Sequence, residues 1–339
     1  CLRKMNDIQQ DFTSFADEGD EDELQTIIGW AKNSKDGSKA DLSFIPRDDV
    51  WEKVAAESDT CTRSKCLYFR SCFVNKARRQ ASRAQLLVVN HHLLFADLAI
   101  RYQVGRTAAS AVLPPYHRII FDEAHHLEDV ATNYFGAQIT RGGLLRILNR
   151  LHRQQKGVPK GLLHALHRFL LFKKRSLPED LFDEISRKIT SELLYSVGEL
   201  VNATTDIMDQ LDTIIRESSE NSQDVEIKIR LQPHVCTQLL EGSGLDIVFK
   251  EYLLRLKALS ASLLSLLSLV RKTKEYLKED IENQVVEMRA QTERLNLASE
   301  ALEEILFQQD EDHIRWIEIR RGYKERKIIH FQSSPLDVS

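Results

Sequence analysis

The chain has 339 residues, with 47 Lys and Arg against 51 Asp and Glu, which gives a formal net charge of −4. Hydrophobic residues make up 42% and charged residues 29%, a balance typical of globular rather than disordered proteins. The length suffices for two or more domains, and only 13 Gly and 7 Pro disfavour an all-β sandwich and favour long helices. The most apolar stretch, Ala258 to Val270, is shorter than a span of roughly 18 residues, so we expect no membrane segment.

Cysteine usage and the first residue bear on the cellular setting. Five cysteines, an odd number, disfavour a disulfide scaffold and favour a reducing, intracellular environment. The chain begins with Cys1 rather than Met, which predicts either a fragment or a mature protein cut before a cysteine, as lipoproteins are.

The small net charge hides uneven blocks. The first 60 residues carry 15 acidic against 7 basic groups, whereas residues 61–120 carry 10 basic groups and a single acid, Asp97. Residues 136–175 carry 10 basic groups and no acid. The two basic blocks predict surfaces for a polyanionic partner.

The first half of the chain predicts short elements. The first 60 residues look irregular, with an acidic run leading into a short helix from Leu24 to Ala31. Two short apolar runs, Leu86 to Val89 and Arg118 to Phe121, are typical of buried strands of an α/β sheet.

The second half predicts a helical region from about 140 to 312. Leu256, Leu263, Val270 and Leu277 are spaced seven residues apart, so we expect an antiparallel helical stalk from Leu253 to Leu306, with a dimerising coiled coil as the alternative. Residues 316–319 and 327–331 predict a terminal hairpin. Cys236 is expected in the core.

The sharpest chemical motif is Asp122-Glu123-Ala124-His125, directly after the second predicted strand. Acids at the carboxyl end of a strand in an α/β sheet lie where nucleotides bind. Hydrolysis of a nucleoside triphosphate needs one group that holds Mg²⁺ and one that orients water, roles that we assign to Asp122 and Glu123. The alternative is a solvated acidic turn. The phosphate-binding motif Gly-x-x-x-x-Gly-Lys-Ser/Thr is absent from the sequence, which again predicts a fragment.

Three thiols, Cys61, Cys66 and Cys72, are five and six residues apart, and Cys1 can supply a fourth. Four thiolates suit structural zinc or a 4Fe-4S cluster. The sequence lacks the Cys-x-x-Cys spacing common in zinc ribbons, which favours the cluster, and free cysteines remain the alternative.

Cations and aromatic rings interleave around these cysteines, a pattern typical of platforms for single-stranded nucleic acid. The predicted DNA contacts are Arg63, Lys65, Arg70, Lys76, Arg78, Arg79 and Arg83. Tyr68, Phe69 and Phe73 either stack on bases or pack around a cluster. In the second basic block, Arg146, Arg150 and Arg153 are predicted on one helix face, which faces either DNA or solvent. His164 and His167 lack a third metal ligand nearby in the sequence.

Five motifs in order resemble the iron–sulfur superfamily 2 DNA helicases, and among them the bacterial DinG group, relatives of XPD. They are Cys1-Leu-Arg-Lys-Met, Trp51-Glu-Lys-Val, the Cys61/Cys66/Cys72 group, Val88-Val89-Asn90-His91-His92-Leu93-Leu94, and Asp122-Glu123-Ala124-His125. The resemblance implies an α/β fold, namely a partial RecA-like motor domain with an inserted iron–sulfur domain and a large, mostly α-helical arch domain.

The resemblance also implies residue ranges and roles. The expected ranges are 1–84 for the iron–sulfur domain, 85–135 for part of motor domain 1 with the DEAH box, 136–315 for the arch, and 316–339 for the return toward the motor. By this likeness Cys1, Cys61, Cys66 and Cys72 hold a 4Fe-4S cluster. Asp122 binds Mg²⁺ with ATP as the substrate, Glu123 activates water, and His125 couples hydrolysis to DNA.

The implied function is ATP-dependent 5′–3′ unwinding in DNA repair, in the bacterial cytoplasm at the nucleoid. The implied protein is a monomer acting on single-stranded or forked DNA and on RNA–DNA hybrids, without a membrane. The phosphate loop and second motor domain are missing, so we expect this chain alone to be inactive. The alternatives are a DinG-like nuclease and a non-enzymatic zinc or iron–sulfur nucleic-acid-binding protein with a helical adaptor arm.

Overall fold

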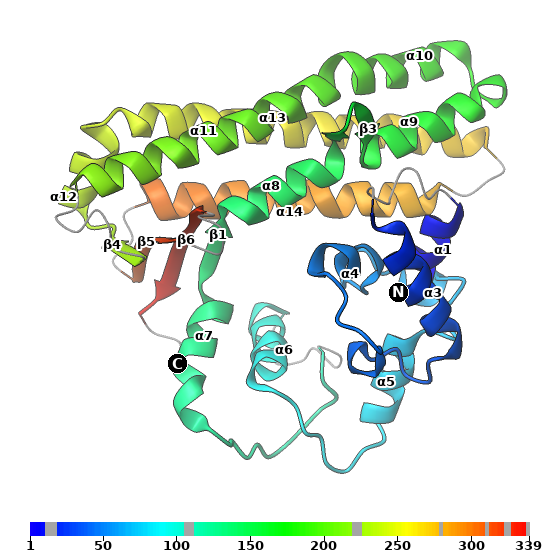
Figure 1. Ribbon diagram of the computed structural model, residues 1–339, viewed down its shortest axis with the longest axis horizontal. Coiled ribbons are helices and arrows are strands. Elements are labelled where there is room, and N and C mark those ends of the chain that lie inside the picture. Colours follow the sequence, from blue (N-terminus) through cyan, green and yellow to red (C-terminus); the bar gives the residue numbers. More distant parts are fainter. Residues whose placement is uncertain are drawn as a thin grey trace. The chain divides into compact units, whose positions relative to one another are not determined.

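The computed structural model of the chain describes residues 1–10, 19–104, 112–218, 226–277, 281–308, 312–321 and 327–336. It divides into two compact units, Cys1–Val130 and Ala131–Ser339 (Figure 1). The N-terminal unit contains the helices α1 (Leu2–Gln10), α3 (Glu21–Asn33), α4 (Asp48–Val54), α5 (Phe73–Ala81) and α6 (His91–Val104), and the first part of α7 (Leu127–Phe135). Its single-turn helices are η1 (Lys39–Asp41), η2 (Arg63–Lys65) and η3 (Ala124–His126).

The core of the N-terminal unit lies among its first three helices. It consists of Met5, Ile8, Leu24, Ile27, Ile28, Ala31, Val50 and Val54. Helix α3 begins within the acidic run of the sequence. Three acids in its first turn and Lys32 in its last turn stabilise it, because their charges complement the helix dipole. The expectation of a largely irregular first 60 residues is therefore wrong, although the helix around Leu24 is confirmed and extends further at both ends.

Beyond this core the chain carries no buried side chain from residue 61 to residue 93, all of which the structure describes. The predicted buried strands are wrong. Leu86–Val89 and Arg118–Phe121 are extended but unpaired, and Val88 and Ile120 are 92% and 95% exposed. A strand is stable only when neighbouring strands satisfy its backbone groups, and the described part of this unit contains no strand.

The C-terminal unit is a helical bundle on a small sheet. Its helices are α8 (Arg141–Leu151), α9 (Leu162–Phe172), α10 (Glu179–Arg187), α11 (Leu194–Ser218), α12 (Pro233–Cys236), α13 (Leu245–Lys272) and α14 (Glu282–Phe307). The π-helical turns η5 (Lys188–Leu193) and η6 (Thr237–Glu241) and the 3₁₀ turns η4 (Lys174–Ser176) and η7 (Thr273–Glu275) join them. Its strands are β1 (Ala137–Thr140), β2 (Arg153–Gln155), β3 (Val158–Lys160), β4 (Glu226–Arg230), β5 (His313–Arg321) and β6 (Lys327–Pro335).

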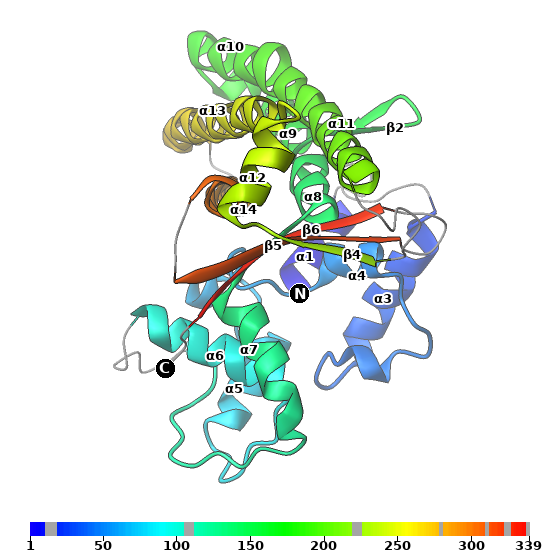
Figure 2. The same cartoon turned by 90° about the vertical axis from the view of Figure 1, so that its left-hand side faces the viewer.

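The four-stranded sheet has the order β1-β6-β5-β4 and is antiparallel throughout. The predicted terminal hairpin is confirmed as β5 and β6, with Ile317 opposite Phe331. Alternate residues of these strands form one apolar face, against which α8 and α14 pack (Figure 2). Phe249 of α13 meets Phe331 edge to face, with ring centroids 6.0 Å apart.

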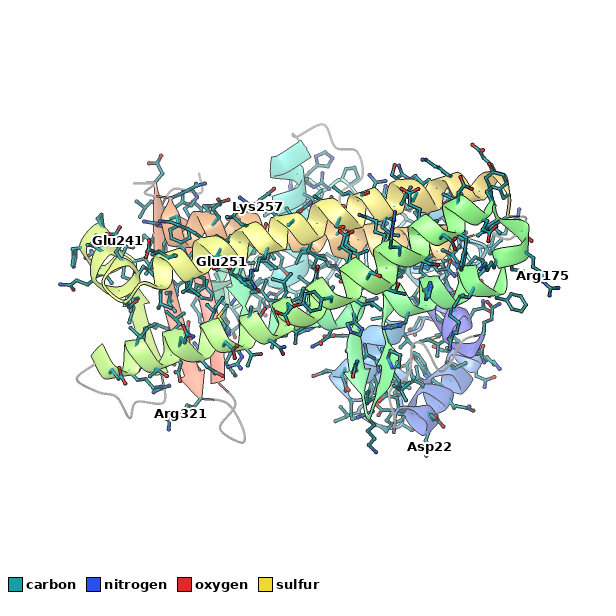
Figure 3. All side chains as sticks on the ribbon, turned by 90° about the horizontal axis from the view of Figure 1, so that it is seen from above. Asp22, Arg175, Glu241, Glu251, Lys257 and Arg321 are labelled. Atoms are coloured by element: carbon teal, nitrogen blue, oxygen red, sulfur yellow. The ribbon has the colours of Figure 1, made fainter. Side chains whose placement is uncertain are left out.

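The long helices α13 and α14 form the predicted stalk. Leu256, Leu263 and Val270 of the seven-residue repeat are completely buried. Lys257 in the first half of α13, labelled in Figure 3, pairs with Glu303 near the end of α14 at 2.7 Å, as expected for antiparallel helices. Residues Leu245–Glu275 form one helical stretch long and apolar enough to cross a membrane, which the sequence prediction did not anticipate. Half of an apolar 18-residue window within that stretch is buried inside the protein, as in the core helix of a bundle.

Candidate functional site

The Asp122-Glu123-Ala124-His125 segment forms a tight, exposed turn. The Oδ1 atom of Asp122 accepts a hydrogen bond from the backbone N–H of Glu123 at 3.0 Å. Glu123 adopts a left-handed backbone (φ 49°, ψ 48°) and precedes the single turn η3. A left-handed glutamate is strained, and such strain is concentrated at functional sites. The turn presents both carboxylates to solvent.

His125 lies beside the second acid of this turn. Its Nδ1 atom is 3.3 Å from Oε2 of Glu123, and both side chains are 67% exposed. The ring centroids of His126 and His125 are 4.0 Å apart, and the two ring planes are tilted by 43°. The three residues expected to act in hydrolysis are therefore adjacent, and Glu123 and His125 are in direct contact.

A second sequence motif reaches the same turn. Asn90 caps α6, because its Oδ1 accepts the N–H of Leu93 at 2.8 Å. His91, the first residue of α6, lies with its ring 6.4 Å from that of Phe121, immediately before Asp122. The Asn90-His91-His92 motif thus lies next to the residue that leads into the acidic turn, although the two motifs are thirty residues apart in sequence.

Asp97 anchors the segment that leads to this site, a role that the sequence analysis missed. Its carboxylate is completely buried and accepts backbone hydrogen bonds from Val112 and Leu113, both at 2.8 Å. Tyr116 donates to it at 3.3 Å. One sequence feature could have indicated this role: Asp97 is the only acid among residues 61–120. A single acid on an apolar helix is commonly buried and satisfied by hydrogen bonds.

The four cysteines of the proposed cluster lie in the N-terminal unit. Cys61 is exposed, and Cys1, Cys66 and Cys72 are half-buried; none of the chain's five cysteines forms a disulfide. Burial, together with the positive charges of Lys4 and Arg3, lowers the pKa of the Cys1 amino group to about 6, and Cys72 opposes this shift. Cys72 is therefore close enough to the Cys1 amino group to interact with it electrostatically, although the two residues are 71 positions apart.

The cysteine segment is a series of tight turns. Arg63, between Cys61 and Cys66, has φ 51°, and Cys72 is the residue that immediately precedes α5. Among the described residues no three His, Cys, Asp or Glu side chains are gathered closely enough to hold a metal ion. The four thiols therefore do not form an assembled ligand set in this structure.

All seven cations predicted to contact DNA are exposed, and none forms an ion pair with a carboxylate in the described part of the chain. Three of these cations lie on helix α5. Lys76 and Arg79 line a cavity together with Phe73, whereas Arg78 does not line it. Tyr68 and Phe73 are half-buried, and Phe69 is 37% exposed.

The second basic block is only partly as predicted. Leu144, Leu148 and Leu151 are buried on one face of α8, as expected. Arg153 does not share the helix with Arg146 and Arg150, because α8 ends at Leu151 and Arg153 begins β2. Arg150 is held within the unit by Glu287 at 3.0 Å.

Two further predictions concern isolated side chains of the C-terminal unit. Cys236 is half-buried rather than deep in the core, since it ends the short helix α12. His164 faces His152, with 3.0 Å between Nε2 and Nδ1, whereas His167 contacts Ser186 at 3.3 Å. His152 was not recognised from the sequence because it lies twelve residues away, beyond the end of α8.

Comparisons with known proteins bear on this geometry. No family model matches the chain. It is 35% identical over 120 residues to the ATP-dependent DNA helicase YoaA of Escherichia coli, a match that covers 35% of this chain and 18% of that protein. It is 34% identical over 119 residues to YoaA of Haemophilus influenzae, covering 35% and 18%. It is 31% identical over 132 residues to the ATP-dependent helicase DinG of Mycobacterium tuberculosis, covering 39% and 19%.

The matched part is limited, since it spans less than a fifth of the length of these curated relatives. Over that part the chain is homologous to proteins named YoaA and DinG, as its five motifs led us to expect.

Proposed function

We propose that this chain contributes part of the first motor domain, the iron–sulfur domain and the arch of a DinG-type, ATP-dependent DNA helicase. The observation that carries the proposal is the acidic turn Asp122–His125 with His91 beside it, in a chain homologous to named helicases. The protein then works on DNA in the bacterial cytoplasm.

In this proposal each residue of the turn has one task. Asp122 holds the Mg²⁺ of bound ATP, which neutralises charge on the phosphates, and Glu123 orients the attacking water. His125, in contact with Glu123 at 3.3 Å, relays the state of the nucleotide to the DNA path. Exposure of both side chains is expected of residues that meet a ligand and a second motor domain. Hydrolysis also requires phosphate-binding residues that the printed sequence does not contain in their usual form.

The test of these roles is ATP hydrolysis stimulated by single-stranded DNA. In the helicase that contains these residues, Glu123→Gln removes the water-orienting carboxylate and reduces the turnover number at least about hundredfold, with ATP binding retained. Unchanged turnover in this variant contradicts the assignment. DNA-stimulated ATPase activity of the 339-residue chain by itself contradicts our expectation that it is inactive alone.

We further propose that Cys1, Cys61, Cys66 and Cys72 bind a 4Fe-4S cluster. The supporting observation is the absence of buried side chains from residue 61 to residue 93, which leaves this segment without a hydrophobic core of its own. Small segments of this kind are commonly held by metal ligands. Because the thiols are not gathered in this structure, assembly requires the Cys61–Cys72 segment to close on Cys1.

Anaerobic purification tests the cluster. We expect about four iron and four acid-labile sulfide per chain, lost in Cys66→Ser and retained in Cys236→Ser, the matched control from the other unit. Stoichiometric zinc without iron assigns the cysteines to a zinc site and overturns the cluster.

The proposed DNA path follows the seven exposed cations around the cluster, on single-stranded or forked DNA and with 5′–3′ movement. Salt-dependent binding to a single strand tests it, because each phosphate contact releases counterions. We expect Arg78→Ala to weaken binding and to reduce the salt slope by about 0.7. An unchanged slope in Arg78→Ala combined with Arg83→Ala excludes this segment from the DNA path.

A further inference from the structure

The N-terminal unit contains a cavity of about 710 Å³ that neither the acidic turn nor the four cysteines line. Helix α1, the end of α3, the loop that follows it, the segment after Cys66 and helix α5 surround it. Its volume falls within the range of small-molecule sites, roughly 300–1,000 Å³.

The walls of the cavity carry one sign of charge. Five cations from four segments converge on it, and the described part of its lining contains no carboxylate: Lys32, Lys35, Arg70, Lys76 and Arg79. Like charges around one volume repel each other unless an anion or solvent screens them. The arrangement therefore favours a ligand with several negative charges, such as a polyphosphate.

One side of the cavity offers a fixed aromatic ring. Gly37 (φ 71°) packs directly on Phe73, since a Cβ atom added at Gly37 would lie 2.4 Å from the ring. Met5 and Ile28, both buried, extend the apolar surface beside it, and Tyr68 supplies a second half-buried ring. The cavity thus combines a flat apolar surface with a cationic rim.

The loop that holds Phe73 is itself fixed. Lys76 Nζ donates to the carbonyl of Lys35 at 2.6 Å, which ties the loop to α5. The hydroxyl of Ser34 accepts the N–H of Gly37 at 2.9 Å. A wall held in this way is formed before a ligand arrives, which reduces the entropy lost on binding.

We propose that this cavity binds a free nucleoside di- or triphosphate, with the phosphates on the cations and the base against Phe73. The site is separate from the acidic turn, and its existence does not depend on the helicase activity proposed above. Three of these cations, Arg70, Lys76 and Arg79, are also among the seven proposed DNA contacts. The present proposal assigns these three to a free nucleotide, because together with Lys32 and Lys35 they surround one volume instead of following a line, and it leaves the DNA path to Arg63, Lys65, Arg78 and Arg83. Bound there, the nucleotide neutralises the cations of α5 that face the cavity.

The test is calorimetric binding of ADP to the chain purified anaerobically, in EDTA and about 200 mM salt, where weak strand binding is suppressed. We expect one ADP per chain. We expect Lys76→Met in α5 and Lys32→Met at the end of α3 each to weaken ADP binding at least tenfold, and Phe73→Leu to do the same. The control Lys39→Met, a lysine of the same unit outside this lining, leaves ADP binding unchanged.

Fluorescence of Trp30 and Trp51, which pack together in the core of this unit, reports whether each variant is folded. Failure to bind ADP at millimolar concentration overturns the proposal. If inorganic pyrophosphate binds as tightly as ADP, the base contributes nothing to binding. That result overturns the role of Phe73 and hence the nucleotide assignment. A short single-stranded oligonucleotide that displaces ADP at stoichiometric concentration assigns the cavity to the DNA path and overturns a free ligand.

Discussion

The carboxylate of Asp97 accepts a hydrogen bond from the guanidinium of Arg101, one turn later on α6, with 2.6 Å between Oδ2 and Nε. Arg101 also donates to the carbonyl of Leu113 at 2.9 Å. The pair therefore joins α6 to the segment that leads to the acidic turn. Burial opposes ionisation of Asp97, but hydrogen bonds from Arg101, Leu113 and Val112 outweigh it, so the pKa of Asp97 lies below its usual value.

Asp97→Asn should destabilise the N-terminal unit by about 3 kcal/mol at pH 7, because Arg101 loses its buried counter-charge. A carboxyl whose pKa is lowered by folding stabilises the fold above its unfolded pKa of about 3.9, and that stabilisation is lost as the pH falls through the folded value. The difference between wild type and variant should therefore shrink at about pH 3. Urea titrations at several pH values, followed by Trp30 and Trp51 fluorescence in a Trp316→Phe background, measure this difference in the free energy of unfolding. A difference that does not change with pH contradicts the role of the Asp97 charge.

Leu263→Ala should cost about 3 kcal/mol, because Leu263 is completely buried in the stalk and its truncation leaves a cavity. Its neighbour Leu264 is 51% exposed, so Leu264→Ala should change stability by less than about 0.5 kcal/mol. Circular dichroism during urea unfolding compares the two. Equal losses would mean that both faces of α13 are buried in solution, as in a coiled-coil dimer, and sedimentation at several concentrations would then detect the dimer.

Gly37→Ala should destabilise the N-terminal unit by about 2 kcal/mol, because the new methyl group meets Phe73 and the positive φ disfavours any side chain. The control is Gly29→Ala in the exposed face of α3, where nothing lies within 4 Å of the added methyl. That change should stabilise by about 0.5–1 kcal/mol. A stabilising Gly37→Ala would show that Phe73 is not held against the loop.

Acid should destabilise the C-terminal unit through His164. Burial, together with the charges of His152 and His167, lowers its pKa to about 4. A histidine with a lowered folded pKa gives full stability above its unfolded pKa of about 6.5 and loses it as the pH falls toward about 4. His164→Gln should therefore flatten the stability profile between those values, whereas His234→Gln, at an exposed position, should not. Parallel profiles for the wild type and both variants would contradict this assignment.

Local patterns in the sequence were enough to predict the stalk and the terminal hairpin. A seven-residue repeat places Leu256, Leu263 and Val270 on one helix face whatever the partner, and alternating residues do the same for β5 and β6. The sequence also indicated that Asp122 to His125 belong together, but it did not predict the left-handed backbone of Glu123.

What the sequence could not supply depends on groups far apart in the chain. Whether Leu86–Val89 becomes a strand is decided by neighbouring strands, because a single extended segment cannot satisfy its own backbone. Asp97 binds the backbone of Val112 and Leu113, at least fifteen positions away, and His152 pairs with His164, twelve positions away; no local pattern encodes these contacts.

The pairing of β1 with β6 has a consequence for how this protein can change. Gln138 of β1 and His330 of β6 are in contact at 2.9 Å although 192 positions apart, so the chain enters and leaves the bundle on adjacent strands. A module whose two ends meet can be lengthened, shortened or exchanged as a cassette without displacing the segments that flank it. The same closure joins a loop of nearly 200 residues, so β1 and β6 should be among the last elements to pair during folding.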